Sequence, residues 1–184
     1  MLAQEAVSQL GLECVLLMPT GAAPHKRIDP EPGAQVRLEM ARAAAVDDEL
    51  LEASELEVRR DGPSYTVNTL AELRDLRPDD ELFFLMGADV AAHLEEWREP
   101  ERVLELARLG IAGRPGTVLD EVEAALERLG ASERAEVVRM PEIGVSSTRI
   151  RRRVAQGRPI RYLVPDRVAA MIAERGLYRE AVRA

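Results

Sequence analysis

Three hydroxyl residues stand directly ahead of a run of arginines near the C-terminal end of the sequence. Ser146, Ser147 and Thr148 occupy the expected start of a helix. There, unpaired backbone N–H groups, hydroxyl donors and the positive end of the helix dipole converge on one point. Arg151, three residues beyond Thr148, returns to the same face and can direct two donors at phosphate oxygens. This spacing predicts a phosphate site, and an ordinary N-cap at Ser146 or Ser147 also fits the residues.

The charge of the chain is unevenly distributed around this site. The net charge is −8, yet residues 139–184 contain 11 arginines, no lysine and four acidic residues, a balance of +7 that leaves −15 on residues 1–138. A basic segment in an acidic chain suggests a local anion site, and a solvated helix face is the plainer alternative. Arg152 and Arg153 point away from Ser147 on a helix and are interpreted as solvated.

Short apolar runs alternate with longer helical patterns along the chain. The runs, each expected to form a strand, are residues 14–18, 55–58, 82–86, 108–112 and 135–140; the helical patterns include residues 35–46, 100–107, 120–130 and 165–176. This alternation predicts an α/β fold, a parallel sheet with crossover helices. A helical face begins at Leu2 with no strand before it, so the first strand of such a sheet is expected to be missing. At 184 residues we expect a single domain spanning 1–184.

Ligands of an open α/β sheet bind outside the carboxyl ends of the strands. Polar residues follow several of the predicted strands: His25 and Lys26 follow residues 14–18, Asp89 follows residues 82–86, and Arg114 follows residues 108–112. Singly, each has a plainer explanation: a surface histidine, an N-cap aspartate or an exposed turn arginine. Because all of these residues are expected at the same edge of the sheet, a shared ligand-binding site is favoured for them as a group.

Aromatic residues supply a second kind of recognition. Tyr65 and Thr66 precede a helix with Val67 and Leu70 on one side, so backbone amides there can receive a carboxylate. Trp97, the only tryptophan, lies eight residues after Asp89 and can stack on a heteroaromatic ring, although a core or subunit contact is an equally good explanation.

Composition excludes several classes. The longest apolar run is too short to cross a bilayer, which predicts a cytoplasmic protein with no membrane partner. Cys14, the single cysteine, rules out a disulfide within the chain and is expected to be buried.

Six segments together resemble bacterial nicotinate-nucleotide adenylyltransferase, a nucleotidyltransferase of the HIGH superfamily. They are PTGAAPHK, PSYTVNTL, GADVAAHLEEW, GRPG, GVSSTRIR and YLVPDRVAAMIAERGLY. The resemblance implies a Rossmann-like fold and transfer of AMP from ATP to nicotinate mononucleotide, with substrate-associated Mg²⁺ and no metal site in the protein. It gives Tyr65, Thr66, Trp97 and Arg114 to the substrate. The residues it gives to the nucleotide are His25, Lys26, Asp89, Ser147, Thr148 and Arg151.

The sequence departs from this family at its N-terminal end. The family opens with a strand and a His-x-Gly-His motif that contacts ATP phosphates, and neither His25 nor His93 has that spacing. The catalytic residues therefore stay unassigned, and Met1 is expected to lie inside the first helix of a shortened enzyme. Two alternatives remain: a catalytically impaired nucleotide-binding relic, and an RNA-binding module using the arginine-rich segment. The second is disfavoured because few aromatics are interleaved with the arginines, so nucleic acid is not expected as a partner.

Overall fold

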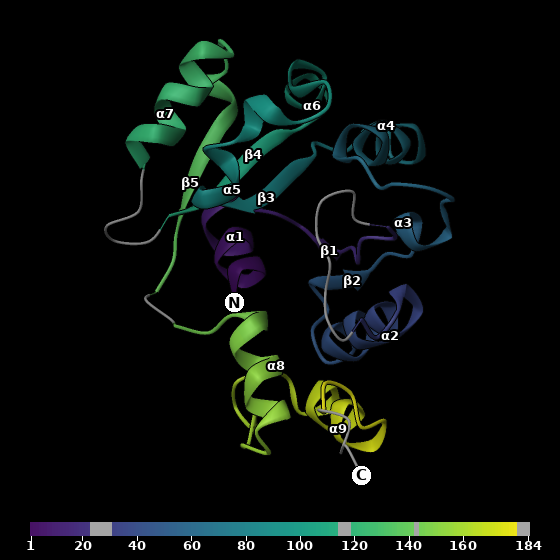
Figure 1. Cartoon of the computed structure of the whole chain (residues 1–184). Coiled ribbons are helices and arrows are strands. Elements are labelled where there is room, and N and C mark those ends of the chain that lie inside the picture. The colour runs from purple at the N-terminus through teal and green to yellow at the C-terminus, as the bar shows by residue number, and fades with distance from the viewer. Residues whose placement is uncertain (23–30, 114–118, 142–143, 180–184) are drawn as a thin grey trace. The chain divides into compact units, whose positions relative to one another are not determined.

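The computed structural model describes residues 1–22, 31–113, 119–141 and 144–179. The chain divides into two compact units. Figure 1 colours the chain by residue number, from purple at the N-terminus to yellow at the C-terminus. Unit 1 comprises Met1–Val15 and Ser64–Glu142, and unit 2 comprises Leu16–Pro63 and Ile143–Ala184. The expectation of one domain over residues 1–184 stays a prediction.

Unit 1 is built on a three-stranded sheet. Its strands are β3 (Phe83–Gly87), β4 (Arg108–Gly113) and β5 (Ala135–Arg139), and its helices are α1 (Leu2–Leu10), α4 (Thr66–Leu76), α5 (Ala88–Ala91), η1 (Leu94–Glu96), α6 (Pro100–Leu106), α7 (Leu119–Arg128) and η2 (Ser132–Arg134). All three strands run parallel in the order β3-β4-β5, with Leu109 opposite both Phe84 and Ala135. The parallel α/β prediction is confirmed for this sheet.

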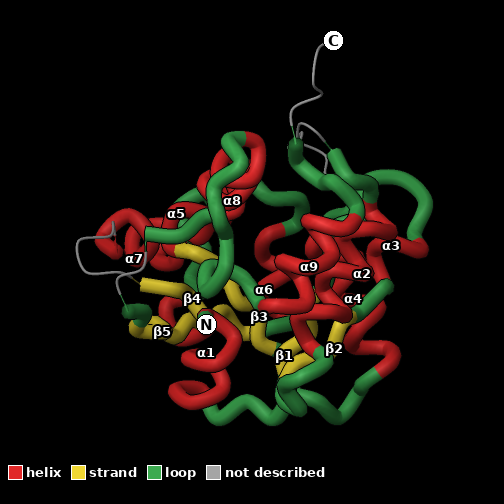
Figure 2. The backbone as a smooth tube through the Cα atoms, turned by 90° about the horizontal axis from the view of Figure 1, so that it is seen from below, coloured by secondary structure: helices red, strands yellow, loops and turns green. Residues whose placement is uncertain are grey.

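Helices cover both faces of the β3-β4-β5 sheet because its residues alternate in direction. Leu109 and Ile111 join the buried cluster that contains residues of α5 and α7. Gly110, between them, faces the other way, where a Cβ atom would lie 3.1 Å from Leu10 of α1. Figure 2 shows α1 lying against β4 and β5. A glycine at this position therefore lets α1 approach the sheet.

The outer edge of β5 is closed by a glutamine of α1. The Gln9 amide donates to the backbone oxygen of Arg139 at 2.9 Å and accepts from its backbone N–H at 2.9 Å. This one side chain makes the pair of bonds that a neighbouring strand would otherwise supply, and edge groups that are paired are protected from joining another chain.

Unit 2 holds a smaller sheet and the remaining helices. Its elements are α2 (Ala34–Ala45), β2 (Leu51–Ala53), α3 (Leu56–Arg59), α8 (Ser147–Ala155) and α9 (Asp166–Glu174), and β2 pairs with β1 (Val15–Leu17). Helices α2 and α9 pack together. One ion pair joins Arg167 of α9 to Asp47, just beyond α2, and another joins Arg175, just beyond α9, to Glu39 within α2.

Two sequence expectations are wrong here. Residues 55–58 form the turn of α3 instead of a strand, because Arg59 N–H donates to the Glu55 oxygen at 3.0 Å and the same two side chains form an ion pair one turn apart. The strand lies earlier, at β2. Cys14 is exposed, not buried.

Within the described residues no helix is both long and apolar enough to cross a membrane.

Candidate functional site

The N-terminus of α8 presents hydroxyl groups and a guanidinium together. Ser146 is the N-cap: its Oγ accepts the backbone N–H of Arg149 at 3.2 Å. Ser147 and Thr148 begin the helix with exposed side chains, and Arg151 Nη2 donates to Thr148 Oγ1 at 3.3 Å. Of the two possible caps, Ser146 therefore takes that role, which leaves Ser147 and Thr148 facing solvent beside Arg151.

Tyr178 lies in the electrostatic surroundings of Arg151. Burial raises the pKa of the Tyr178 phenol, Arg151 and Arg37 oppose this rise, and Glu31 adds to it. The phenol is thus neutral at pH 7 and able to donate a hydrogen bond. Its backbone has φ +59°, a left-handed conformation that is unusual for a bulky residue. Unit 2 therefore places a neutral donor near the guanidinium of Arg151.

Arg37 of α2 is a residue that the sequence analysis missed. Its guanidinium donates to the backbone oxygens of Thr20 at 2.6 Å and Gly21 at 3.3 Å, and it pairs with Glu31 at 3.0 Å. The side chain is only 19% exposed. Residues 35–46 contain two arginines, Arg37 and Arg42, and the position of Arg37 between the apolar Val36 and Leu38 was the available signal. Arg37 fixes the chain just ahead of residues 23–30, which lie outside the described residues and include His25 and Lys26.

Arg153 corrects another prediction. It was expected to be solvated, but its Nε and Nη2 atoms both donate to the backbone oxygen of Pro159, at 3.0 and 2.8 Å. Arg152 is exposed, as expected. The arginines of α8 therefore have at least two roles: Arg151 contacts Thr148 at the start of the helix, and Arg153 binds the loop that follows it.

In unit 1, Trp97 is held by packing. It follows η1, its backbone N–H donates to the Leu94 oxygen at 3.1 Å, and its ring meets that of Phe84 edge to face, with centroids 5.6 Å apart and planes at 83°. The ring is half-buried against the main cluster of the sheet. Both stacking on a ligand and a core role fit this setting, because the indole packs against Phe84 while part of it stays accessible.

Tyr65 and Thr66 lie at the start of α4, as predicted. Tyr65 is the N-cap, with an extended backbone and no side-chain cap bond, and Thr66 is the first helical residue. The guanidinium of Arg98, the residue after Trp97, lies 4.8 Å from the centroid of the Tyr65 ring. Arg98 was not predicted as a site residue from the sequence, where its place beside Trp97 was the only signal.

Asp89 is exposed in the first turn of α5, which is four residues long. Gly87 is the N-cap, so the alternative of Asp89 as the cap is wrong. A Cβ atom at position 87 would collide with Asp89 Oδ1. Glycine thus allows the Asp89 carboxylate to fold back over the end of β3.

The predicted site residues fall in two groups. Thr148 and Arg151 are in contact within unit 2, whereas Tyr65, Thr66, Asp89 and Trp97 belong to unit 1. Arg114, like His25 and Lys26, lies outside the described residues. In the described part of the chain, no three or more His, Cys, Asp or Glu side chains are grouped so that they could hold a metal ion. A divalent ion brought in by a nucleotide needs no such cage, because phosphate oxygens and water supply most of its ligands.

Comparison with known proteins gives the class first. The model of the cytidylyltransferase-like family matches residues 1–153, which places the chain in a class of nucleotidyltransferases, enzymes that generally use a divalent metal. Probable nicotinate-nucleotide adenylyltransferases of Roseiflexus sp. (strain RS-1) and of Thermus thermophilus are each 42% identical to it, over 97% and 96% of this chain and 89% of each relative. The chain belongs to the nicotinate-nucleotide adenylyltransferase family.

Solved structures agree on the fold. The Plasmodium falciparum nicotinic acid mononucleotide adenylyltransferase, complexed with APC in one structure and with NaAD in another, superposes with TM-scores of 0.72 and 0.73 at 15% and 16% identity. The matches cover 96% and 95% of this chain and 88% and 87% of those chains.

Proposed function

We propose that this protein transfers AMP from ATP to nicotinate mononucleotide. An oxygen of the mononucleotide 5′-phosphate attacks the α-phosphorus of ATP, a new P–O bond forms, and the α–β anhydride bond breaks with its electrons leaving on pyrophosphate. The other product is nicotinate adenine dinucleotide. Because the substrate supplies the nucleophile, no side-chain nucleophile is needed, and catalysis rests on positioning and on stabilising charge at the α-phosphate.

The observation that carries the proposal is the contact between Arg151 and Thr148 at the Ser146-capped end of α8. We assign Ser147, Thr148 and Arg151 to the ATP phosphates, since a helix N-terminus with added hydroxyl and guanidinium donors favours bound phosphate. His25, Lys26 and Asp89 are proposed to contact the nucleotide as well.

The pyridine nucleotide is proposed to use the aromatic group of unit 1. Trp97, packed at a right angle to Phe84, offers its indole to the pyridine ring, and the start of α4 at Tyr65 and Thr66 offers backbone amides to the carboxylate. Arg114 is proposed to contact a phosphate. The divalent metal is proposed to be Mg²⁺ bound to ATP, where it lowers the charge of the phosphates, and the reaction is proposed to take place in the cytoplasm.

The test is to incubate the chain with ATP, Mg²⁺ and nicotinate mononucleotide and to measure pyrophosphate and nicotinate adenine dinucleotide together. We expect equal amounts of the two products, with nicotinamide mononucleotide as a comparison substrate. Fluorescence of the only tryptophan, Trp97, gives an independent binding readout. Pyrophosphate without dinucleotide, or no quenching by either mononucleotide, would contradict the proposal.

A further inference from the structure

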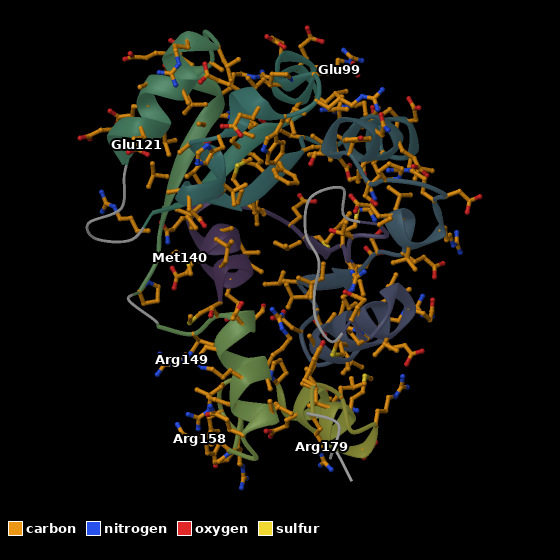
Figure 3. All side chains as sticks on the ribbon, in the orientation of Figure 1. Glu99, Glu121, Met140, Arg149, Arg158 and Arg179 are labelled. Atoms are coloured by element: carbon orange, nitrogen blue, oxygen red, sulfur yellow. The ribbon has the colours of Figure 1, made fainter. Side chains whose placement is uncertain are left out.

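A second cationic surface lies on α8. Successive residues of an α-helix are about 100° apart, so Arg149 and Arg153 lie roughly half a turn around the axis from Ser147 and Arg151. Figure 3 shows Arg149 on the side of α8 turned away from α9. This surface is therefore separate from the side of α8 that carries Ser147, Thr148 and Arg151.

The surface borders a cavity of about 510 Å³, here named the arginine pocket, lined by Arg149, Arg153, Arg161 and Tyr162 among others. The walls are tied down. Arg149 Nη1 donates to the Gly144 oxygen at 2.6 Å, and the two bonds from Arg153 to Pro159 join the loop after α8 to the helix. Because both anchoring partners are neutral carbonyls, the positive charge of these guanidiniums is not neutralised by the contacts that hold them.

Tyr162 occupies an unusual position in this pocket. The residue is 83% exposed and its backbone has φ +63°. The Arg161 guanidinium lies 5.0 Å from the ring centroid, and Leu163 N–H donates to the Ile160 oxygen at 3.1 Å. A bulky residue in left-handed backbone is strained, and such strain gathers at functional positions. The exposed ring and the left-handed backbone together make Tyr162 a candidate for contact with a ligand.

The charge of the pocket is unbalanced. From Gly144 to Pro165 the sequence has six arginines and no acidic residue. No ion pair joins Arg149, Arg153 or Arg161 to any acidic residue of the described ranges. In a chain with net charge −8, this is a strong local attraction for an anion.

We propose that the arginine pocket is a second nucleotide site, separate from the one used for AMP transfer. Guanidinium groups suit phosphate, the Tyr162 ring with Arg161 suits a planar heteroaromatic base, and the cavity has the size of a small-molecule site. The ligand class is a phosphorylated compound with a flat ring. ATP and the dinucleotide product share this chemistry.

The test uses isothermal titration calorimetry on the full chain carrying Arg151→Ala, which weakens the site proposed for AMP transfer and leaves the pocket intact. Separate titrations use ATP, nicotinate adenine dinucleotide and inorganic phosphate. We expect binding of both nucleotides to persist and phosphate alone to bind more weakly. The nucleotide that binds more tightly is then identified as the ligand of the arginine pocket. Adding Arg149→Ala should weaken nucleotide binding about 10-fold or more, as loss of a charged hydrogen bond does.

Two further variants test the proposal, one at the Tyr162 ring and one as a control for loss of charge. Tyr162→Gly removes the ring while relieving the positive φ, so the melting temperature should hold or rise while affinity falls about 5-fold or more. Arg152→Ala removes the same charge from an exposed position of α8 outside the pocket, and it should change affinity less than about 2-fold.

Equal effects of Arg149→Ala and Arg152→Ala would overturn the proposal, as would loss of all nucleotide binding in Arg151→Ala. In a further titration with a single-stranded RNA, tighter binding of the RNA than of either nucleotide would also overturn it. The AMP-transfer proposal fails separately, by absence of dinucleotide formation in the unmodified chain.

Discussion

The two units hold their candidate residues by different means. In unit 1, Trp97 and Tyr65 are positioned by apolar packing and by contacts between rings and a guanidinium. In unit 2, Thr148 and Arg151 are positioned at an exposed helix end by a cap and a hydrogen bond. Packing depends on shape, whereas exposed polar contacts depend on charge and geometry. Substitutions that alter shape should therefore affect unit 1, and changes of charge should affect unit 2.

The largest effect is expected at Arg151. Arg151→Ala removes a charge-assisted contact worth about 1.5 to 3 kcal/mol, so kcat/KM for ATP should fall about 10- to 150-fold. Arg152→Ala removes the same charge from a solvated position and should do little. Steady-state kinetics with varied ATP measures both. Equal losses would show that the helix acts through diffuse charge and that the contact with Thr148 has no special part.

The next effect is one of shape, at Gly110. A Cβ atom there would press on the Leu85 side chain and lie 3.1 Å from Leu10. Overpacking of a filled core costs about 1 to 3 kcal/mol, so Gly110→Ala should lower the free energy of unfolding by that amount. Urea unfolding followed by circular dichroism measures it. Gly144→Ala, where the nearest atom is Nη1 of the exposed Arg149 side chain at 3.3 Å, is the matched control outside the core and should cost less. A similar cost for both would mean that α1 does not need the glycine.

Sequence spacing predicted the local part of this molecule well. The helix start at residues 146–148 and the return of Arg151 to Thr148 follow from helical periodicity, which involves only neighbouring residues. The strands of the β3-β4-β5 sheet lie within one residue of their apolar runs, because a strand covered by helices must be apolar.

Contacts between distant residues were not accessible in the same way. Arg37 reaches back 17 residues to Thr20, and Arg98 reaches the ring of Tyr65, so their roles depend on tertiary placement that periodicity does not encode. The strand β2 is only three residues long and was missed, since its pattern is too short to recognise. Long flexible arginines can serve several partners, and only the fold selects among them.

A smaller effect should separate packing from direct stacking at Trp97. Phe84→Leu keeps a large apolar side chain but removes the edge-to-face partner, which is worth about 0.5 to 1.5 kcal/mol. If Trp97 reads the pyridine ring, nicotinate mononucleotide should bind about 2- to 12-fold more weakly while ATP binding stays unchanged, as measured by quenching of Trp97. Phe83→Leu is the control, because the Phe83 ring packs under Arg108. Unchanged affinity in Phe84→Leu would mean that Trp97 needs no such support.

The smallest effect is expected at the surface, where the two units have similar ion pairs. In unit 2 the hydrogen bond from Arg167 lowers the pKa of Asp47 below its ordinary value of 3.8, with desolvation opposing and the charge of Arg167 assisting. In unit 1 Arg128 lowers the pKa of Glu95 in the same way, below 4.5. Each carboxylate has a lower pKa folded than unfolded. Its contribution to stability is therefore fully present above the unfolded pKa and is lost as the pH falls through the folded pKa.

Asp47→Asn and Glu95→Gln should each lower the melting temperature slightly at pH 7, because exposed pairs stabilise little. The difference from the unmodified chain should disappear as the pH falls below about 4, where the carboxylates begin to take up protons. High salt should shrink it as well. In an Arg167→Gln background, Asp47→Asn should have no further effect, since the guanidinium that lowers the pKa is gone. A difference that persists at about pH 2, below the ordinary pKa of a carboxyl group, would show that Asp47 acts through packing between α2 and α9, and unit 2 would then share the dependence on shape that marks unit 1.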